Sequence, residues 1–225
     1  MNRRSKTADR RELPAYVISE AGHYLTVPKS TLRYWAMGRA GESKPLIEVA
    51  QRHPLVLSFR NLVELHVLAA MRREFEITLP KVRSALDFLK RKFRVKYPLI
   101  AYEFETDGVN LFVERYGQLI NASQEGQAVM REVIQSSLKR VERDTSGIPI
   151  KLYPYTRSDW RRAPALVVID PELSFGRPVI AGTGLATEVI ADRYKAGESI
   201  QELAQDYGRP AEEVEEAIRC ELEAA

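Results

Sequence analysis

The chain has 225 residues, of which 44% are hydrophobic and 29% charged, a composition typical of a packed protein rather than a disordered one. Its single cysteine, Cys220, excludes an intramolecular disulfide, leaves few ligands for a Cys/His metal site, and favours a reducing cytoplasm. The longest apolar stretch, residues 62–71, is interrupted by Glu64 and His66, so we expect no membrane span. The basic N-terminus has no apolar segment behind it, so we expect no secretory signal.

Charge is distributed unevenly along the chain, although the net charge is only +3. Residues 1–98 hold 20 basic and 9 acidic residues, a net charge of +11, and residues 99–165 are neutral. Residues 166–225 hold 5 basic and 13 acidic residues, a net charge of −8. The basic head suits nucleic acid and the acidic tail suits a protein with a basic surface, unless both blocks are only solvated faces.

The head begins with residues 1–12, which are polar, basic and without periodicity, and which we predict to be a flexible arm. Apolar spacing then predicts one helix over 16–25 and a second over 29–37, closed by Gly38. Two short helices around a tight turn at 26–28 are the pattern of a helix-turn-helix.

Two short strands, over 46–49 and 55–57, are predicted to form a β-hairpin wing after these helices. A long helix over 59–74, apolar on nearly every side, should be buried at the centre of the domain. A further helix begins at Pro80. These elements predict a winged helix-turn-helix DNA-binding domain over residues 13–96.

The middle of the chain, residues 97–157, is predicted to be a small α+β domain. Its expected elements are strands over 99–106 and 109–113 around a hairpin turn at Asp107–Gly108, a third strand over 118–121, a helix over 128–141 and a strand over 148–153. A linker over 158–164 should follow.

The tail, residues 165–225, is predicted to be an acidic helical module. It opens with a strand over 166–169 and a turn-rich stretch; helices are then expected over 187–196, 200–206 and 211–222. Their apolar spacing is again that of a helix-turn-helix core, but the unit has the wrong charge for DNA. The fold class predicted for the whole chain is therefore α+β, mainly α.

Two stretches of sequence resemble known families. EAGHYLTVPKSTLRYW and the long helix that follows resemble MerR-like winged-helix DNA-binding proteins. VIDPELSFGRPVIAGTG, with AGESIQELAQDYG further on, resembles the bacterial module known as domain of unknown function 433. In this order they resemble the VapB-type antitoxins that end in this module. One departure is Gly184, where the module often carries arginine.

This resemblance implies an antitoxin of a bacterial type II toxin–antitoxin system. Such a protein binds and neutralises a PIN-domain ribonuclease toxin, which holds Mg²⁺ or Mn²⁺ with acidic residues, and represses its own operon by binding operator DNA. A homodimer or a toxin–antitoxin hetero-oligomer is expected. We expect no cofactor, no metal and no membrane partner.

The DNA-binding residues that we predict lie on the second helix and at the tip of the wing. They are Lys29, Ser30, Thr31, Arg33, Tyr34 and Arg52. The Arg33 guanidinium can fork to a phosphate or to a guanine edge, although it could instead only cover the domain surface. Trp35 is assigned to the core.

Two arginines in the acidic tail, Arg177 and Arg193, could project into the acidic metal site of the toxin. With Glu188 and Asp192 they form the predicted toxin-binding set. The alternative is that both arginines form local ion pairs within the tail.

No arrangement of side chains in the sequence forms a credible catalytic set, so an enzyme is disfavoured. Cys220 lies among glutamates, which disfavour a thiolate nucleophile. The alternative to an antitoxin is a stand-alone MerR-like transcriptional regulator whose C-terminal module senses a ligand or a partner. The two differ in whether a neighbouring gene encodes a toxic nuclease.

Overall fold

The computed structural model describes residues 9–39, 41–75, 79–101, 104–157 and 159–222, which form a mixed, mainly helical fold. The helices of this part are α1 (Ile18–Leu25), α2 (Lys29–Met37), α3 (Phe59–Glu74), α4 (Leu79–Phe93), α5 (Val109–Ile120), α6 (Gln124–Leu138), α7 (Thr187–Lys195), α8 (Ile200–Tyr207) and α9 (Ala211–Leu222). The strands are β1 (Tyr16–Val17), β2 (Val56–Leu57), β3 (Val141–Arg143), β4 (Pro149–Leu152), β5 (Val167–Ile169) and β6 (Pro178–Ile180).

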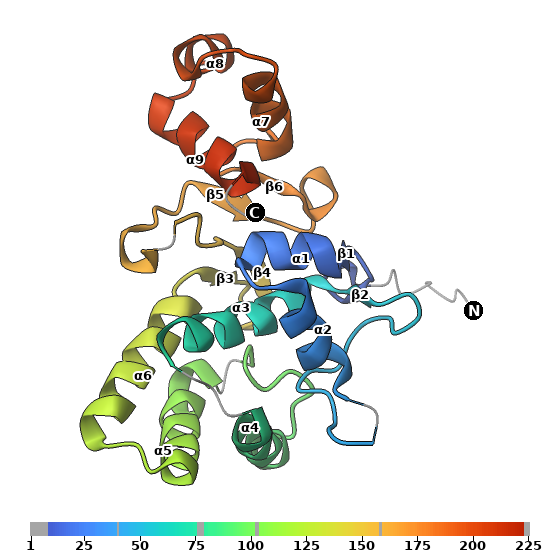
Figure 1. Cartoon of the computed structure of the whole chain (residues 1–225), viewed down its shortest axis with the longest axis vertical. Coiled ribbons are helices and arrows are strands. Elements are labelled where there is room, and N and C mark those ends of the chain that lie inside the picture. Colours follow the sequence, from blue (N-terminus) through green and yellow to red (C-terminus); the bar gives the residue numbers. More distant parts are fainter. Residues whose placement is uncertain (1–8, 40, 76–78, 102–103, 158, 223–225) are drawn as a thin grey trace.

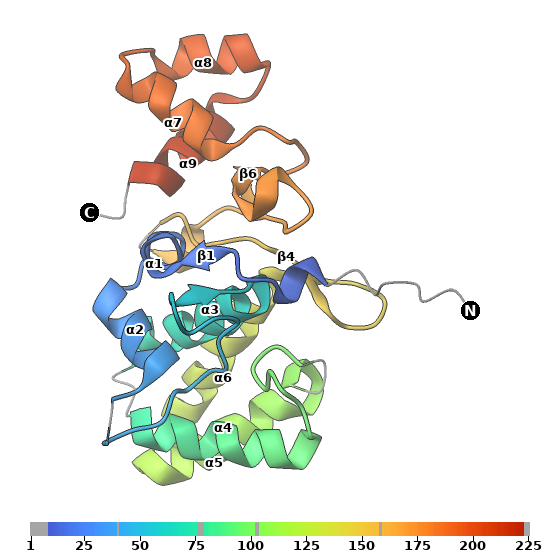
Figure 2. The ribbon, with the colours of Figure 1, turned by 90° about the vertical axis from the view of Figure 1, so that its right-hand side faces the viewer.

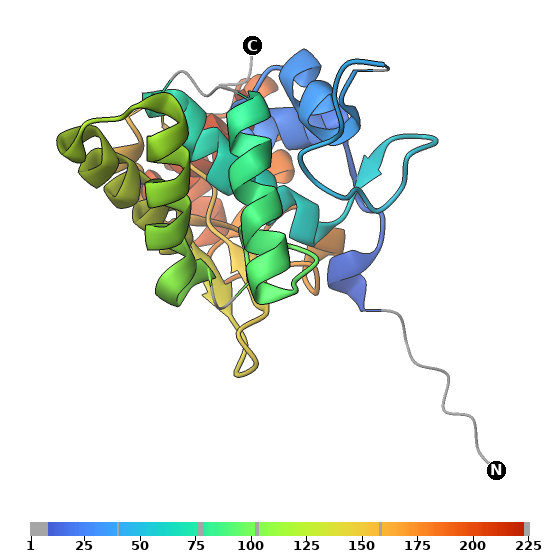
Figure 3. The ribbon, with the colours of Figure 1, turned by 90° about the horizontal axis from the view of Figure 1, so that it is seen from below.

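Helix α3 runs through the middle of the molecule (Figure 1). Helices α4, α5 and α6 cover the side opposite the C-terminal helices, and they face the viewer in Figure 3. Helices α7–α9 stand at the other end, beyond α1 (Figures 1 and 2). An antiparallel sheet of order β3-β4-β5-β6 joins the middle of the chain to this end.

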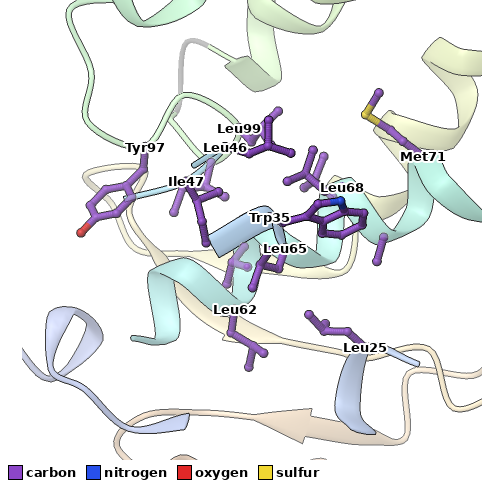
Figure 4. Close-up of a cluster of buried hydrophobic side chains, with 14 of the residues drawn as sticks. Leu25, Trp35, Leu46, Ile47, Leu62, Leu65, Leu68, Met71, Tyr97 and Leu99 are labelled. Atoms are coloured by element: carbon purple, nitrogen blue, oxygen red, sulfur yellow. The ribbon is translucent and has the colours of Figure 1, made fainter. Parts of the chain in front are cut away.

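The long helix predicted over 59–74 is confirmed as α3, and residues 61–71 of it are buried on all sides. Its first turn is capped by Ser58, whose hydroxyl accepts the Asn61 N–H at 3.2 Å. Trp35 of α2, which is 1% exposed, lies beside Leu65 and Leu68 of α3 (Figure 4). Burying each such leucine stabilises the fold by about 1.5–3 kcal/mol, so α3 organises the main core.

Both helices of the predicted helix-turn-helix are present, as α1 and α2. The helices approach closely at Gly22, where an added Cβ would lie 2.9 Å from the Val27 carbonyl oxygen. Thr26 turns the chain between them in the left-handed region, with φ of 53°. Ala21, on the same face of α1, is completely buried. The tight turn therefore depends on two adjacent small residues.

The predicted wing over 46–49 and 55–57 is wrong in its pairing. Strand β2 pairs with β1, with Tyr16 opposite Leu57, and residues 46–49 form no strand. The reason is the buried Asn61, whose side chain donates to the Glu48 carbonyl at 2.7 Å and accepts the Ala50 N–H at 3.0 Å. Because Asn61 satisfies these backbone groups, the segment needs no strand partner.

The middle of the chain is helical where strands were predicted. Residues Phe104–Gly108 form a π-helical turn and α5 follows directly, so the expected hairpin at Asp107–Gly108 and the strands over 109–113 and 118–121 are wrong. Of the strand predicted over 99–106, residues 102–103 lie outside the described residues, and the described remainder forms no strand. The buried residues of α5, Val109, Phe112, Val113 and Tyr116, recur at helical spacing. Helix α6 and strand β4 confirm the remaining elements predicted there.

One hydrophobic core runs from Tyr16 to Ile169, so residues 97–157 do not form a core of their own. Helix α6 packs against α3, and α5 packs against α4. The imidazole of His66 in α3 lies 3.2 Å from the Ser137 carbonyl of α6 and stacks on Tyr155 at 5.1 Å. The predicted head and middle domains are therefore one packed unit.

The predicted arm and linker are also anchored where the structure describes them. Residues 1–8 of the arm lie outside the described residues, but Arg10–Glu12 form a 3₁₀ turn. Arg60 pairs with both Asp9 and Glu12 at 3.0 Å. In the linker, Trp160 is buried in the 3₁₀ turn Trp160–Arg162, and its indole N–H donates to Glu74 at 2.6 Å. Neither segment is free because each supplies ion pairs or apolar area to the main unit.

The predicted tail elements are confirmed as β5, α7, α8 and α9. Ser199 and Glu202 form the capping contacts at the start of α8, with the Glu202 N–H 3.2 Å from the Ser199 hydroxyl. A second apolar cluster fills this module: Ile180, Ile190, Leu203, Val214, Ala217 and Ile218. The helices of the tail therefore have an apolar cluster of their own, whereas Ile169 of β5 belongs to the main core.

We predict that Glu64 makes stability depend on pH. Burial raises the pKa of Glu64 to about 8, and its Oε2 has no hydrogen-bond partner among the described residues. Because the folded pKa lies above the unfolded value, this group's contribution is present in acid and is lost as pH rises from about 4.5 to about 8. The charged groups that act on Glu64 are Lys90, Lys96 and Glu48.

The measurement is the free energy of unfolding of the wild type and of Glu64→Gln between pH 5 and 8.5. Relative to the variant, the wild type should lose roughly 4 kcal/mol across this range. Glu114→Gln, an exposed carboxylate on α5, should follow the wild type. Parallel curves for the wild type and Glu64→Gln would show that the carboxyl is not desolvated as described.

Candidate functional site

The first candidate surface is one face of α2. Lys29, Ser30 and Arg33 are exposed, and their spacing places them on the same side of the helix. Thr31 and Tyr34 are half-buried beside them. No described carboxylate forms an ion pair with Lys29 or Arg33, so both cations remain available to a polyanion.

A cavity of about 470 Å³ opens along this face of α2. The predicted residues Ser30, Thr31, Arg33 and Tyr34 line it, together with two arginines that the sequence did not single out, Arg39 and Arg72. Arg72 is the basic end of α3 and meets α2 only in the tertiary structure. The structure therefore adds two cations to the predicted DNA-binding set.

Gly38 fixes the chain at the end of this cavity. Its φ is 71°, and an added Cβ would lie 2.1 Å from the Ser43 carbonyl oxygen, so only glycine fits. The turn brings Arg39 back over the Tyr34 ring, 5.6 Å from its centroid. The Arg39 guanidinium also pairs with Glu42 at 3.4 Å. Arg39 is thus positioned by the turn rather than by a helix.

Arg52 is exposed in the turn closed by the backbone bridge between Gln51 and Val56. The loop that carries it extends outward on the side of the molecule where α2 lies (Figures 1 and 3). No described carboxylate pairs with Arg52. Arg52 therefore lies in an exposed turn, as expected, although the predicted pairing of strands around it is absent.

The second candidate surface is the junction between α1 and the C-terminal module. Arg177 forms an ion pair with Glu20 of α1 and lies 3.5 Å from the Tyr24 hydroxyl. The hydrogen bond to Glu20 raises the pKa of the Arg177 guanidinium, and burial raises the pKa of Tyr24 to about 12. His23 of α1 lies 3.6 Å from Glu221 of α9. The two ends of the chain therefore contact each other through α1.

This contact leaves α2 uncovered. In Figures 1 and 2, α7–α9 stand above α1, whereas α2 points away from them. The charged groups of the junction, Glu20, His23, Arg177 and Glu221, pair with one another and not with Lys29 or Arg33. The basic face of α2 and the outer face of the module are both accessible in the same chain.

The other arginine of the predicted toxin-binding set, Arg193, is held inside the module. Its guanidinium pairs with Glu198 and Asp206 and lies 5.0 Å over the Tyr207 ring. Hydrogen bonding to Glu198 raises the pKa of the Arg193 guanidinium. Arg177 and Arg193 are therefore both engaged in ion pairs, one with a distant helix and one locally.

The carboxylates of the module divide into paired and unpaired groups. Glu216 is completely buried and accepts a hydrogen bond from the Arg157 Nε at 2.7 Å. Asp192 pairs with Lys195 at 3.2 Å. In contrast, Glu188, Glu212 and Glu215 are exposed, and no described cation pairs with them. The outward charge of the module is consequently negative, with Glu188 the one member of the predicted set that is left free.

Other kinds of site find little support in the described part of the chain. No group of three or more His, Cys, Asp or Glu side chains there is placed to hold a metal ion. Burial raises the pKa of the Cys220 thiol, which keeps it protonated. No described helix has both the length and the apolar character that a bilayer crossing requires.

Comparisons with known proteins match both the C-terminal module and the chain as a whole. Residues 167–219, which include the acidic module, match the family described as "Protein of unknown function (DUF433)". The chain is 29% identical to "Putative antitoxin VapB45" of Mycobacterium tuberculosis, over 92% of this chain and 93% of the relative. It is 25% identical to the "Uncharacterized protein Rv2308" of the same organism, over 90% and 88%.

The fold is also found in a solved structure. The crystal structure of Rv2018 from Mycobacterium tuberculosis superposes with a TM-score of 0.70 and covers 93% of this chain and 100% of that one. The sequences are 23% identical, so this match concerns the fold. The arrangement of helices and strands over most of this chain therefore occurs in a known structure.

We predict that Arg177 stabilises the junction. Arg177→Met removes the pair with Glu20 and the contact with Tyr24, and it should lower the free energy of unfolding by about 1 kcal/mol, as for other partly exposed charged hydrogen bonds. It should also speed amide hydrogen exchange in α1. Arg162→Met is the matched control, since that arginine is 84% exposed and pairs only with Asp159. Unchanged exchange in α1 would contradict a junction held by Arg177.

Proposed function

We propose that this chain is the antitoxin of a bacterial type II toxin–antitoxin system, which neutralises a PIN-domain ribonuclease toxin and represses its own operon. The observation that carries the proposal is the similarity to a protein named as an antitoxin over 92% of the chain. Two independent features support it: an unpaired basic face on α2 and an acidic module at the other end. The binding roles need no catalytic set, so we propose a binding protein and not an enzyme.

The proposed operator surface is the face of α2. Lys29 and Arg33 would neutralise phosphates or read a guanine edge, and Arg39 and Arg72 would extend this contact along the cavity. Ser30, Thr31 and the Tyr34 hydroxyl would donate to phosphate oxygens. Arg52 would reach an adjacent groove. A homodimer would present two such faces to the two halves of an operator.

The proposed toxin surface is the acidic module. A ribonuclease that binds RNA presents basic groups to its substrate, and the free carboxylates of Glu188, Glu212 and Glu215 would compete for them. Asp192 adds charge beside its partner Lys195. Arg177 and Arg193 are held in ion pairs, so a direct role for either would require breaking those pairs.

A stand-alone regulator is the second candidate, and the junction favours it. A cavity of about 320 Å³ lies between α1 and the module, lined on the module side by Arg177, Thr187, Glu188 and Glu221. A small ligand bound there would contact both α1 and the module. Such a regulator would need no toxic neighbour.

The deciding experiment is co-expression with the product of the adjacent gene, followed by co-purification and a nuclease assay. An antitoxin should form a stable complex with that product and abolish its cleavage of RNA. A neighbour that is harmless when expressed alone and does not bind the chain would overturn the proposal and favour the regulator.

We predict that Arg33→Ala weakens binding to the operon promoter about tenfold or more and lowers its salt dependence. The reason is the loss of a bidentate contact to phosphate or guanine. The measurement is a titration of a promoter fragment at several salt concentrations. Arg115→Ala, an exposed arginine on α5, should bind DNA as the wild type does. Equal losses of DNA binding and toxin binding in Arg33→Ala would contradict separate surfaces.

We predict that the free carboxylates accelerate toxin binding. The triple variant Glu188→Gln, Glu212→Gln and Glu215→Gln should associate several-fold more slowly, with a weaker dependence on salt, because electrostatic steering is lost. The matched control changes three exposed carboxylates on α5 and α6: Glu114, Glu125 and Glu132. The measurement is the association rate constant of each variant with the immobilised toxin at several salt concentrations. Equal association rate constants for the two triple variants would exclude the module as the steering surface.

A further inference from the structure

Phe175 is an exposed aromatic residue that the functions above do not use. Its side chain is 95% exposed, whereas the next most exposed large apolar side chain in the described residues, Val189, is 47% exposed. It lies in the 3₁₀ turn Ser174–Gly176, between β5 and β6. An aromatic ring placed wholly in water contributes nothing to the core, so the fold does not explain it.

The backbone at Phe175 is in an unfavourable conformation. Ser174 has φ of 44° and Phe175 has φ of 56°, so two successive residues with side chains occupy the left-handed region. Glycine at these two positions would remove the steric cost of the left-handed conformation. In this turn glycine occupies the next position, Gly176, instead. Such strain persists where the surrounding structure fixes it, and it concentrates at functional positions.

The turn is fixed by a dense set of hydrogen bonds. The Asp170 side chain accepts the Glu172 N–H at 2.8 Å, and the Leu173 carbonyl accepts the Gly176 N–H at 2.8 Å. Gly176 rests on Tyr16 of β1, where an added Cβ would lie 2.4 Å from the tyrosine hydroxyl. Together these contacts hold Phe175 outward. Less conformational entropy is therefore lost when a partner binds.

The surroundings of Phe175 define the chemistry of a partner. Leu173 beside it is 39% exposed, which widens the apolar area. Asp170 and Glu172 precede it in the same turn-rich segment, and Glu172, whose side chain is 67% exposed, forms an exposed ion pair with Arg10 at 3.6 Å. An aromatic centre with an acidic border fits a protein pocket that is apolar inside and rimmed by lysine or arginine.

We propose that Phe175 is the anchor residue of the toxin interface, inserted into an apolar pocket of the toxin that basic side chains surround. This inference rests on the proposed antitoxin function and names the residue that contributes most to the complex. Exposed aromatics also stack on nucleic-acid bases, but the carboxylates of Asp170 and Glu172 would repel the phosphates.

The test uses the full-length chain and the purified product of the adjacent gene. Phe175→Ala should weaken their binding roughly 30-fold or more, the loss typical of an interface anchor. Its melting temperature should not fall, because the side chain contacts little of the fold. Phe175→Tyr should retain most of the affinity. Val129→Ala, an exposed apolar residue on α6, is the matched control and should bind as the wild type does.

Each other outcome overturns the inference in a distinguishable way. If Phe175→Ala binds the product with unchanged affinity, the assignment of Phe175 as the anchor residue is wrong, while the proposed antitoxin function stands. If the variant alters the sedimentation of the chain alone, the occupant is a second copy, and if it alters affinity for promoter DNA, the occupant is nucleic acid. If the wild type does not bind the product, the proposed function fails and the inference fails with it.

Discussion

The burial of the middle of α3 is the constraint on which the rest of the structure depends. Residues 61–71 have no solvent face and must be covered on every side, so α1 and α2 pack on one side of the helix and α6 on another. The same burial removes charge from two ionisable residues: it raises the pKa of Glu64 and lowers the pKa of His66 to about 3. Helices α1 and α2 and the middle helices therefore share one core, and α2 is supported by α3.

The C-terminal module is attached to this body through the β4–β5 pairing, through Ile169 of the main core, and through polar contacts with α1. Its own apolar cluster is separate, and Arg177 and Glu221 contact α1. Helix α1 thus lies between the module and α2, so a partner bound to the module contacts a surface one helix away from the proposed operator surface. Lys29 and Arg33 lie on α2, and Glu188, Glu212 and Glu215 lie on α7 and α9, which keeps the two proposed binding surfaces opposite in charge and apart in space.

Much of the candidate site could be predicted from the sequence because it lies within single helices. Lys29, Ser30 and Arg33 share a face by helical spacing alone. Arg39 and Arg72 could not be predicted, because their approach to α2 depends on the left-handed turn at Gly38 and on the packing of α3. The pairing of Arg177 with Glu20 was also beyond the sequence, since 157 residues separate them and only the docking of the module brings them together.

The sequence by itself determined the elements whose signals are local: α1 to α4, α6 to α9, the glycine that ends α2, and the change of charge from head to tail. Tertiary structure decided what depends on distant partners. Asn61 satisfied the backbone of residues 48–50 and replaced the expected wing strand. The need to cover α4 and α6 made Val109–Ile120 a helix in spite of the turn signal at Asp107–Gly108. Local periodicity fixes a helix, whereas pairing and burial are set by residues far along the chain.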